Sequence, residues 1–229
     1  MRFRLLAPLV VMAGALPLSA ARHGDTNRIG SRDINRGVYG FPNFLGLEEE
    51  RRIGAEIETR MRRSLTISTD SAAISKVRDL SEQILKNSDY KGDLTLHVTA
   101  DGSLQACAVM GGYLFIDETV LKLASRTDEL AAVIAHEIAH MAARHGAELF
   151  CYQQLVARGH RRSSAVLPSL ASKIQEDELE ADELAGQYLK RTGFDPSALA
   201  DILCKLDQSG RTRWRAQAIV RANGQPLHR

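Results

Sequence analysis

The sequence predicts an α+β fold that is mainly helical and contains a small antiparallel sheet. Apolar residues recur at the helical period of roughly 3.6 residues in four segments, and a stretch between the second and third alternates apolar with polar residues, as half-buried strands do. The 229 residues are enough for one domain with a sizeable core, even after a short N-terminal leader is set aside.

Residues 1–21 are predicted to be a signal peptide. A short basic start precedes an apolar stretch over 5–18 that contains two prolines, and Ser19-Ala20-Ala21 suits cleavage before Arg22. The stretch is too short for a membrane span and contains no cysteine for a lipoprotein anchor. We therefore expect export to the periplasm, a soluble mature chain without a transmembrane span, and at most peripheral association with the cell envelope.

The charge balance gives no indication of a nucleic-acid partner. Without the leader the chain holds 28 basic and 28 acidic residues. The short basic clusters at 60–63, 161–162 and 211–215 are offset by nearby acids, so we interpret them as solvated faces.

Two helices are predicted ahead of the strands. Residues 22–46 should be irregular, because glycines and a proline lie among polar residues. A helix over 47–63 then opens a single domain that extends over 47–229. The second helix begins at Asp70 or Ser71, either of which can cap it. The apolar faces consist of Ile53, Ile57 and Met61 in the first helix and Ile74, Val77, Leu80 and Ile84 in the second.

Three strands are predicted next. Apolar and polar residues alternate over 94–99, whereas 106–109 and 113–116 flank a turn that contains Gly111 and Gly112. The glycine pair has two interpretations. It can simply satisfy turn geometry, or it can form an edge at which a substrate backbone approaches the sheet.

A His-Glu-x-x-His motif lies in a helix predicted to start at Thr127 and to stop at Gly146. His136 and His140 lie one turn apart on one face, so both imidazoles can reach one ion at about 2.0–2.1 Å. Glu137 lies about 100° around the helix, which suits a general base that reaches a water on the ion rather than the ion itself. The alternative is a chance arrangement in a buried helix, but an uncompensated Glu137 carboxylate would be costly there.

Two other histidines are not expected to bind the ion. His145 lies off the ligand face of the helix and is interpreted as structural or surface, and His97 lies on the polar face of a strand and is interpreted as a surface residue. A metzincin would require glycine at 143 and histidine at 146, but the chain has Ala143 and Gly146. The third ligand must therefore come from another segment.

That ligand is expected in the acidic run 176–183, which should open a helix stopped by Gly193. Complementation of the helix dipole explains most of these charges, so helix geometry must select among them. Glu178 and Asp182 lie on one face, whereas Glu180 lies about 200° from Glu178 and should face solvent. We predict Glu178 as the third ligand and Asp182 as the carboxylate that orients a ligand histidine. The residues expected to bury this helix are Leu179, Leu184 and Ala185.

The three cysteines are an odd set. In an oxidising compartment one pair can form a disulfide, and Cys151 with Cys204 is the candidate pair, which leaves Cys107 buried and free. The spacing does not require this bridge.

These residues resemble the M48 peptidases, zinc endopeptidases of the gluzincin type that include soluble periplasmic members. The similar segments, within roughly 45–205, are Leu45 to Gly54, Gln105 to Ile116, Glu129 to His140, Ala143 to Gly146, Glu178 to Asp182 and Gly193 to Pro196. The resemblance implies a zincin-like metallopeptidase domain with one zinc ion per chain, held by His136, His140 and Glu178. It also implies action on unfolded protein or peptide substrates, in quality control of misfolded or misassembled cell-envelope proteins.

Three features depart from the family pattern. Gln105 replaces the usual asparagine and Met110 the usual proline beside the predicted substrate edge. The downstream Ser/Thr-x-His-Pro segment is absent, and Trp214 stands where its histidine would be, so the residue that stabilises the oxyanion is unassigned.

We therefore predict a zinc-dependent hydrolase in which water is the nucleophile and Glu137 takes and returns the proton. The alternative is a metal-stabilised, non-proteolytic chaperone or peptide-binding module that holds unfolded chains along the glycine edge. The altered C-terminal segment favours this alternative. The intact Glu137 argues against it, because binding alone requires no base.

Overall fold

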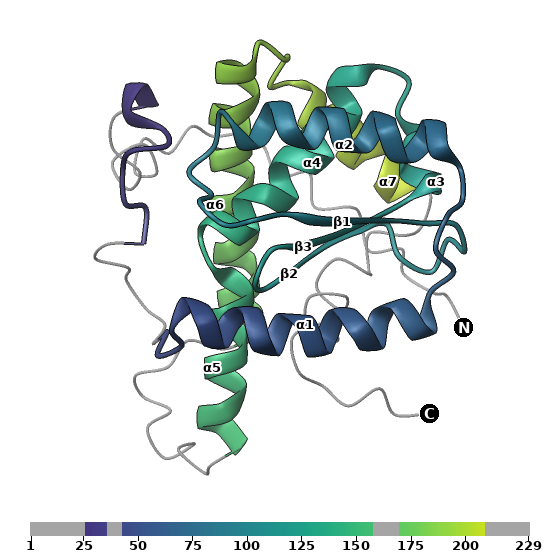
Figure 1. Cartoon of the computed structure of the whole chain (residues 1–229). Coiled ribbons are helices and arrows are strands. Elements are labelled where there is room, and N and C mark those ends of the chain that lie inside the picture. Colours follow the sequence, from purple (N-terminus) through teal and green to yellow (C-terminus); the bar gives the residue numbers. More distant parts are fainter. Residues whose placement is uncertain (1–25, 36–42, 158–169, 209–229) are drawn as a thin grey trace, which may run out of the picture.

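The computed structural model describes residues 26–35, 43–157 and 170–208; the predicted leader and the segment around Trp214 lie outside them. Helices surround one three-stranded sheet, which confirms the predicted α+β class (Figure 1). The described elements are η1 (Thr26–Arg28), α1 (Leu47–Ser64), α2 (Ser71–Leu85), β1 (Thr95–Thr99), β2 (Ala106–Val109), β3 (Tyr113–Asp117), α3 (Glu118–Leu123), α4 (Thr127–Ala142), α5 (His145–Ala157), α6 (Leu170–Thr192) and α7 (Ala198–Gln208). None of the helices in this part of the chain is long and apolar enough to cross a membrane.

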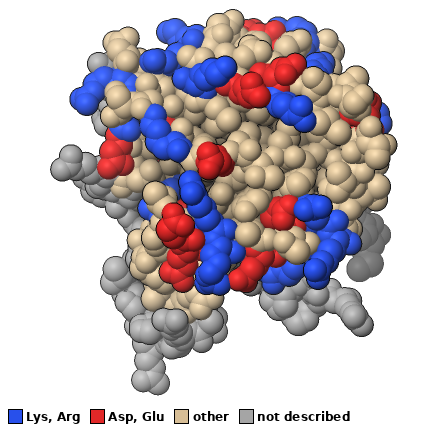
Figure 2. Space-filling view, in the orientation of Figure 1, with Lys and Arg blue, Asp and Glu red and all other residues tan. Residues whose placement is uncertain are grey.

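Helices α1 and α2 follow the predicted patterns and lie on opposite sides of the sheet (Figure 1). The carboxylate of Asp70 caps α2, because it accepts hydrogen bonds from the backbone N–H groups of Ala72 and Ala73 at 2.9 and 3.1 Å. The outer face of α1 carries charges of both signs, such as Arg52 and Glu56 at 2.8 Å. Figure 2 shows acidic and basic side chains interspersed over this side of the molecule.

The sheet is mixed, so the prediction of an antiparallel sheet was wrong in this respect. Strand β3 lies in the middle and pairs antiparallel with β2 and parallel with β1. The chain reverses between β1 and β2, but β3 then inserts between them, so β1 and β2 follow one another in the sequence without being neighbours in the sheet. Alternating hydrophobicity identifies strands without identifying their partners, so the pattern alone left this pairing open.

The two faces of the sheet contribute to separate cores. Leu114 and Ile116 of β3 face the core that contains α2, α4, α6 and α7, whereas Phe115 faces α1 and α5. Strand β2 is an edge strand and packs along α4. This edge is the part of the sheet that approaches the His-Glu-x-x-His motif.

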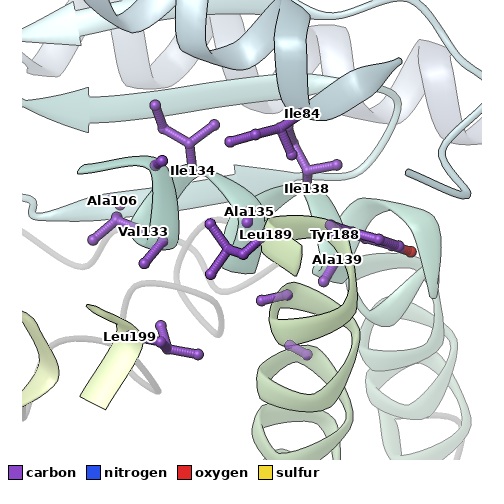
Figure 3. Close-up of a cluster of buried hydrophobic side chains, with 14 of the residues drawn as sticks. Ile84, Ala106, Val133, Ile134, Ala135, Ile138, Ala139, Tyr188, Leu189 and Leu199 are labelled. Atoms are coloured by element: carbon purple, nitrogen blue, oxygen red, sulfur yellow. The ribbon is translucent and has the colours of Figure 1, made fainter. Parts of the chain in front are cut away.

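Helix α4 lies at the centre of the molecule and is buried from Glu129 to Ala142. Figure 3 shows Ile134 and Ile138 near Ile84 of α2, while Ala135 and Ala139 lie on the side of α6. Small side chains on this side allow the two helix backbones to approach closely. Close packing of α4 on α6 brings the two predicted metal-binding segments together.

The chain turns sharply after α4. The helix ends at Ala142 rather than at Gly146, and Arg144 adopts a left-handed φ of 60°. This conformation is held by the Arg144 guanidinium, whose Nε donates to Glu50 at 2.7 Å and whose Nη2 donates to the Leu45 carbonyl at 2.8 Å. Gly146, the predicted stop, lies inside the new helix α5.

Helix α6 begins at Leu170, earlier than predicted, so the acidic run lies within the helix and not in its first turn. Gly193 has a left-handed φ of 91° at the C-terminal end, as expected of a helix stop. Leu184 and Ala185 are buried, but Leu179 is 63% exposed, which contradicts its predicted burial. It lies on the outward side of α6, about 100° from Glu178.

The candidate Cys151–Cys204 disulfide, which the sequence left open, does not form, because all three cysteines are free. Cys107 and Cys151 are buried in the core beside α1, whereas Cys204 is exposed on α7, which packs against α4 on the other side of the sheet. Two cysteines in separate parts of the fold cannot satisfy the geometry of a disulfide.

Residues 26–35, predicted to be irregular, contain the short helix η1 and are anchored to the domain by Arg32. Its guanidinium donates to the Asp89 carboxylate from Nε at 2.9 Å and from Nη2 at 2.7 Å, and Tyr188 of α6 donates to the same carboxylate at 3.1 Å. The Asn35 amide donates to the Ala142 carbonyl at 3.0 Å. This segment therefore packs beside the C-terminal end of α4.

Candidate metal centre

The His-Glu-x-x-His motif lies in the second half of α4, and its three polar side chains are buried. His136 and His140 are one turn apart, and their Nε2 atoms lie 2.9 Å from each other. The rest of α4 around them is apolar, so these polar groups must find partners inside the protein.

Glu178 of α6 lies against both histidines. One carboxylate oxygen is 3.5 Å from His136 Nε2, and the other is 3.4 Å from His140 Nε2. Burial alone would raise the pKa of Glu178, but hydrogen bonds and positive potential from the two histidines hold this pKa far below its usual range. The site therefore contains a charged carboxylate opposite two imidazoles.

His136, His140 and Glu178 fit a divalent metal ion. One donor atom from each lies within 4.8 Å of the other two, and no other such group occurs within the described ranges. Donors around a tetrahedral ion with bonds of about 2.0–2.1 Å lie roughly 3.3 Å apart. The two Nε2 atoms lie 2.9 Å apart, and each lies 3.4 or 3.5 Å from a different oxygen of the Glu178 carboxylate, so the distances are of that order. Three protein ligands leave a fourth position for a water or a substrate.

Asp182 lies one turn after Glu178 on α6, beside His136. Its Oδ1 is 2.8 Å from His136 Nδ1. His136 Nε2 points toward the other donor atoms, so a neutral ring with a free Nε2 lone pair carries its proton on Nδ1, next to this carboxylate. Asp182 therefore lies where a carboxylate can fix the tautomer and the ring orientation of a ligand histidine.

Glu137 is held beside the edge of the sheet. Its Oε2 accepts a hydrogen bond of 2.8 Å from the backbone N–H of Ala108 on β2. The carboxylate is thus buried but partnered, and it lies between the metal-binding helix and the edge strand. Sequence periodicity suggested a residue near the ion, but it gave no indication of this contact with the sheet.

His145 was predicted to be structural or surface, and it is a buried residue in contact with the site. Its Nδ1 lies 2.9 Å from Nδ1 of His140, and its Nε2 lies 3.4 Å from Glu180 on α6. Burial lowers the pKa of His145 to about 4. Glu180, predicted to face solvent, is half-buried against this ring. The prediction assumed an unbroken helix through 145, whereas the turn at Arg144 re-aims the side chain.

A buried ionic cluster lies behind His145. Lys173 of α6 contacts Glu148 of α5 at 2.5 Å and also Asp177, one turn along α6, and all three side chains are buried. Burial raises the pKa of Asp177 to about 7. Burial would lower the pKa of Lys173, but the two carboxylates raise it above its usual value. The cluster ties α5 to the part of α6 that precedes Glu178.

A cavity of about 490 Å³ opens beside His140, between α4, the 108–111 end of the β2 strand and the N-terminal segment. Gly111 lines it, whereas Gly112 does not. Both glycines have left-handed φ angles, of 81° and 97°. A Cβ on Gly111 would lie 2.8 Å from the Cα of Arg51, and one on Gly112 would collide with the Asp93 carbonyl. Turn geometry and close packing with the chain itself therefore account for both glycines.

Residues 72–223 match the sequence model of Peptidase family M48. The chain belongs to this family.

This M48 chain is also similar to three curated relatives. It is 27% identical over 190 residues to the beta-barrel assembly-enhancing protease of Yersinia pestis and 24% identical over 209 residues to that of Escherichia coli (strain K12). It is 31% identical over 147 residues to the mitochondrial metalloendopeptidase OMA1 of Schizosaccharomyces pombe. These alignments cover 72%, 81% and 58% of this chain and 39%, 43% and 43% of the relatives. The chain thus spans about two fifths of the length of the relatives it matches.

Two of the departures from the M48 pattern lie within the described residues, at the start and end of β2. Gln105 is buried, and its backbone carbonyl accepts a hydrogen bond of 2.7 Å from the N–H of Asp117. The Met110 carbonyl lies directly against Gly54 of α1. Both substitutions therefore lie in well-packed backbone and leave the three donor residues of this M48 domain unaltered. The third departure, at Trp214, is outside the described residues.

Proposed function

We propose that the chain is a zinc-dependent endopeptidase that hydrolyses peptide bonds of protein substrates. The observation that carries the proposal is that His136 and His140 converge with Glu178 of α6, while Glu137 follows His136 directly in the His-Glu-x-x-His motif. Membership of an M48 peptidase family supports it, as do relatives that are named proteases. Zinc is proposed because two imidazoles and a carboxylate are a common ligand set for that ion.

The roles of the residues follow from their positions. Zinc held by His136, His140 and Glu178 would supply Lewis-acid chemistry, which activates a water and polarises the scissile carbonyl. Glu137 is the general base that takes a proton from the attacking water and later returns it to the leaving amine. The Ala108 N–H holds the Glu137 carboxylate in place, and Asp182 fixes the ring of His136.

We propose that the substrate lies along the outer edge of β2. No strand of the described sheet pairs with this edge, and its Ala108 N–H donates to Glu137. An extended peptide can add to such an edge through backbone hydrogen bonds, with little dependence on its sequence. Gly111 and Gly112 lie at the end of this edge, where they keep the turn compact.

Unfolded or misassembled proteins of the cell envelope are the proposed substrates, and the periplasm is the proposed compartment. Two relatives are named beta-barrel assembly-enhancing proteases, which supports a substrate in the envelope. The N-terminal sequence supports export, because it has the order of a basic start, an apolar stretch and a small-residue cleavage site.

The test uses the purified chain loaded with zinc alone and an unfolded model protein as substrate. We expect about one zinc per chain and cleavage that a chelator abolishes and added zinc restores. Glu137→Gln should keep the zinc but lose about 10²-fold or more of the turnover, because general base catalysis of this kind contributes roughly 10²–10⁴-fold. Glu56→Gln, on the exposed face of α1, is the matched control and should cleave normally.

Two results would contradict the proposal. Full turnover by zinc-loaded Glu137→Gln would remove Glu137 from the reaction. A wild-type chain that binds zinc and unfolded protein but never cuts it would instead support the non-proteolytic binding module.

A further inference from the structure

The second ring nitrogen of each ligand histidine has a different kind of neighbour. His136 Nδ1 faces the carboxylate of Asp182 at 2.8 Å, whereas His140 Nδ1 faces another imidazole, that of His145, at 2.9 Å. The two rings meet edge to face, with centroids 5.0 Å apart and planes inclined by 74°. His145 opens α5, directly after the turn at Arg144.

We propose that His145 positions the metal ligand His140 and fixes its tautomer by accepting a hydrogen bond from His140 Nδ1. The inference rests on the proposed metal centre and assigns a second residue to its support. It also gives a function to the break between α4 and α5, since a continuous helix would carry residue 145 away from this face.

The proton positions follow from the distances. His140 Nε2 lies among the donor atoms of the site, so it must present a lone pair and the ring must carry its proton on Nδ1. Only one proton fits between two nitrogens 2.9 Å apart, so His145 Nδ1 is the acceptor. The His145 proton then lies on Nε2, which faces Glu180 at 3.4 Å and Asp177 at 3.6 Å.

His145 is not a fourth ligand. It contacts His140 on the side of the ring opposite to the donor Nε2, and it is not part of the group of converging donor atoms found among the described residues. A neutral imidazole here can orient His140 without placing another negative charge beside Glu137, Glu178 and Asp182. The carboxylates of Glu180 and Asp177 lie beyond the His145 ring.

The experiment compares two substitutions of His145 in the purified full chain. His145→Leu fills the space but removes the acceptor, whereas His145→Asn can place an amide oxygen close to the position of Nδ1. Zinc affinity is measured by competition with a chromophoric chelator, and the visible spectrum of the cobalt-substituted protein reports the ligand geometry. We expect a loss of about 10- to 100-fold in affinity for His145→Leu with an altered cobalt spectrum, and a clearly smaller loss for His145→Asn.

His97→Leu is the matched control, because His97 is not the surface residue that the sequence predicted but a largely buried ring with a carboxylate partner, Glu58 at 2.8 Å. It should leave zinc affinity and the cobalt spectrum unchanged. If His145→Leu does not fold, His145→Ala removes the same acceptor with a smaller side chain.

Three outcomes are decisive. Wild-type affinity and spectrum in folded His145→Leu or His145→Ala would overturn the proposal. Equal losses for leucine and asparagine would overturn it as well, because packing and not the acceptor would then matter. If the wild type itself binds no zinc, the metal centre fails, and the role of His145 fails with it; the wild-type titration separates this result from the other two.

Discussion

Replacing Gly54 with alanine tests how α1 is fitted against the turn that ends β2. A Cβ at Gly54 would overlap the carbonyl oxygen of Met110 and lie 2.9 Å from its carbonyl carbon, and 3.2 Å from Cε2 of Tyr113. The first two atoms are backbone, so they cannot move aside as a flexible side chain can. Either α1 or the β2–β3 turn must shift.

The expected loss of stability in Gly54→Ala is worked out by comparison with Gly186 of α6, where a Cβ would meet nothing within 4 Å. Both glycines lie in helix interiors, so alanine brings each about 1 kcal/mol of helix propensity. This gain cancels when the two variants are compared. The remaining difference is the cost of overpacking, typically about 1–3 kcal/mol. For a domain of this size that corresponds to roughly 2–12 °C in Tm.

The assay is thermal unfolding of the metal-free variants, followed by circular dichroism. We expect the Tm of Gly186→Ala to match or exceed that of the wild type. The Tm of Gly54→Ala should lie roughly 2–12 °C below that of Gly186→Ala. A shift of the turn would also displace the Ala108 N–H that holds Glu137, so Gly54→Ala should lose turnover while keeping its zinc. Equal Tm values for the two variants would refute the proposed contact.

The remaining predictions concern the metal centre and the ionic cluster behind it. Glu178→Ala should lose stoichiometric zinc while Glu180→Ala keeps it, as measured by metal analysis after gel filtration; equal loss would show that the assignment on α6 is wrong. Asp182→Asn should weaken zinc binding about 10- to 100-fold in a titration and regain activity with added zinc, and an unchanged Kd with unchanged activity would exclude it from the site. Lys173→Met should destabilise the protein by about 3–5 kcal/mol in denaturant unfolding, because it removes the cation that the buried Glu148 and Asp177 carboxylates share. Lys122→Met, which removes an exposed ion pair at 3.1 Å, should leave the midpoint nearly unchanged.

Several features of the protein were determined by the sequence itself. Residues one helical turn apart must share a face, so the pairing of His136 with His140 and of Glu178 with Asp182 follows from the helix period alone. The motifs also indicated the M48 family, which the match over 72–223 confirms. Alternating hydrophobicity located β1 to within a residue, and the apolar runs on either side of the Gly111-Gly112 turn located β2 and β3 equally closely.

Other features were decided only by the tertiary structure. Once the β2–β3 hairpin has formed, β1 pairs with the remaining edge of β3. Which edge that is depends on the packing of the whole chain and cannot be predicted from a local sequence pattern. The contact between His145 and His140 arises because Arg144, held by Glu50 of α1, leaves the helical conformation and redirects the chain. Helix periodicity predicts side-chain directions only while the helix continues. Where a distant residue ends the helix, the directions of the side chains beyond it are set by tertiary contacts.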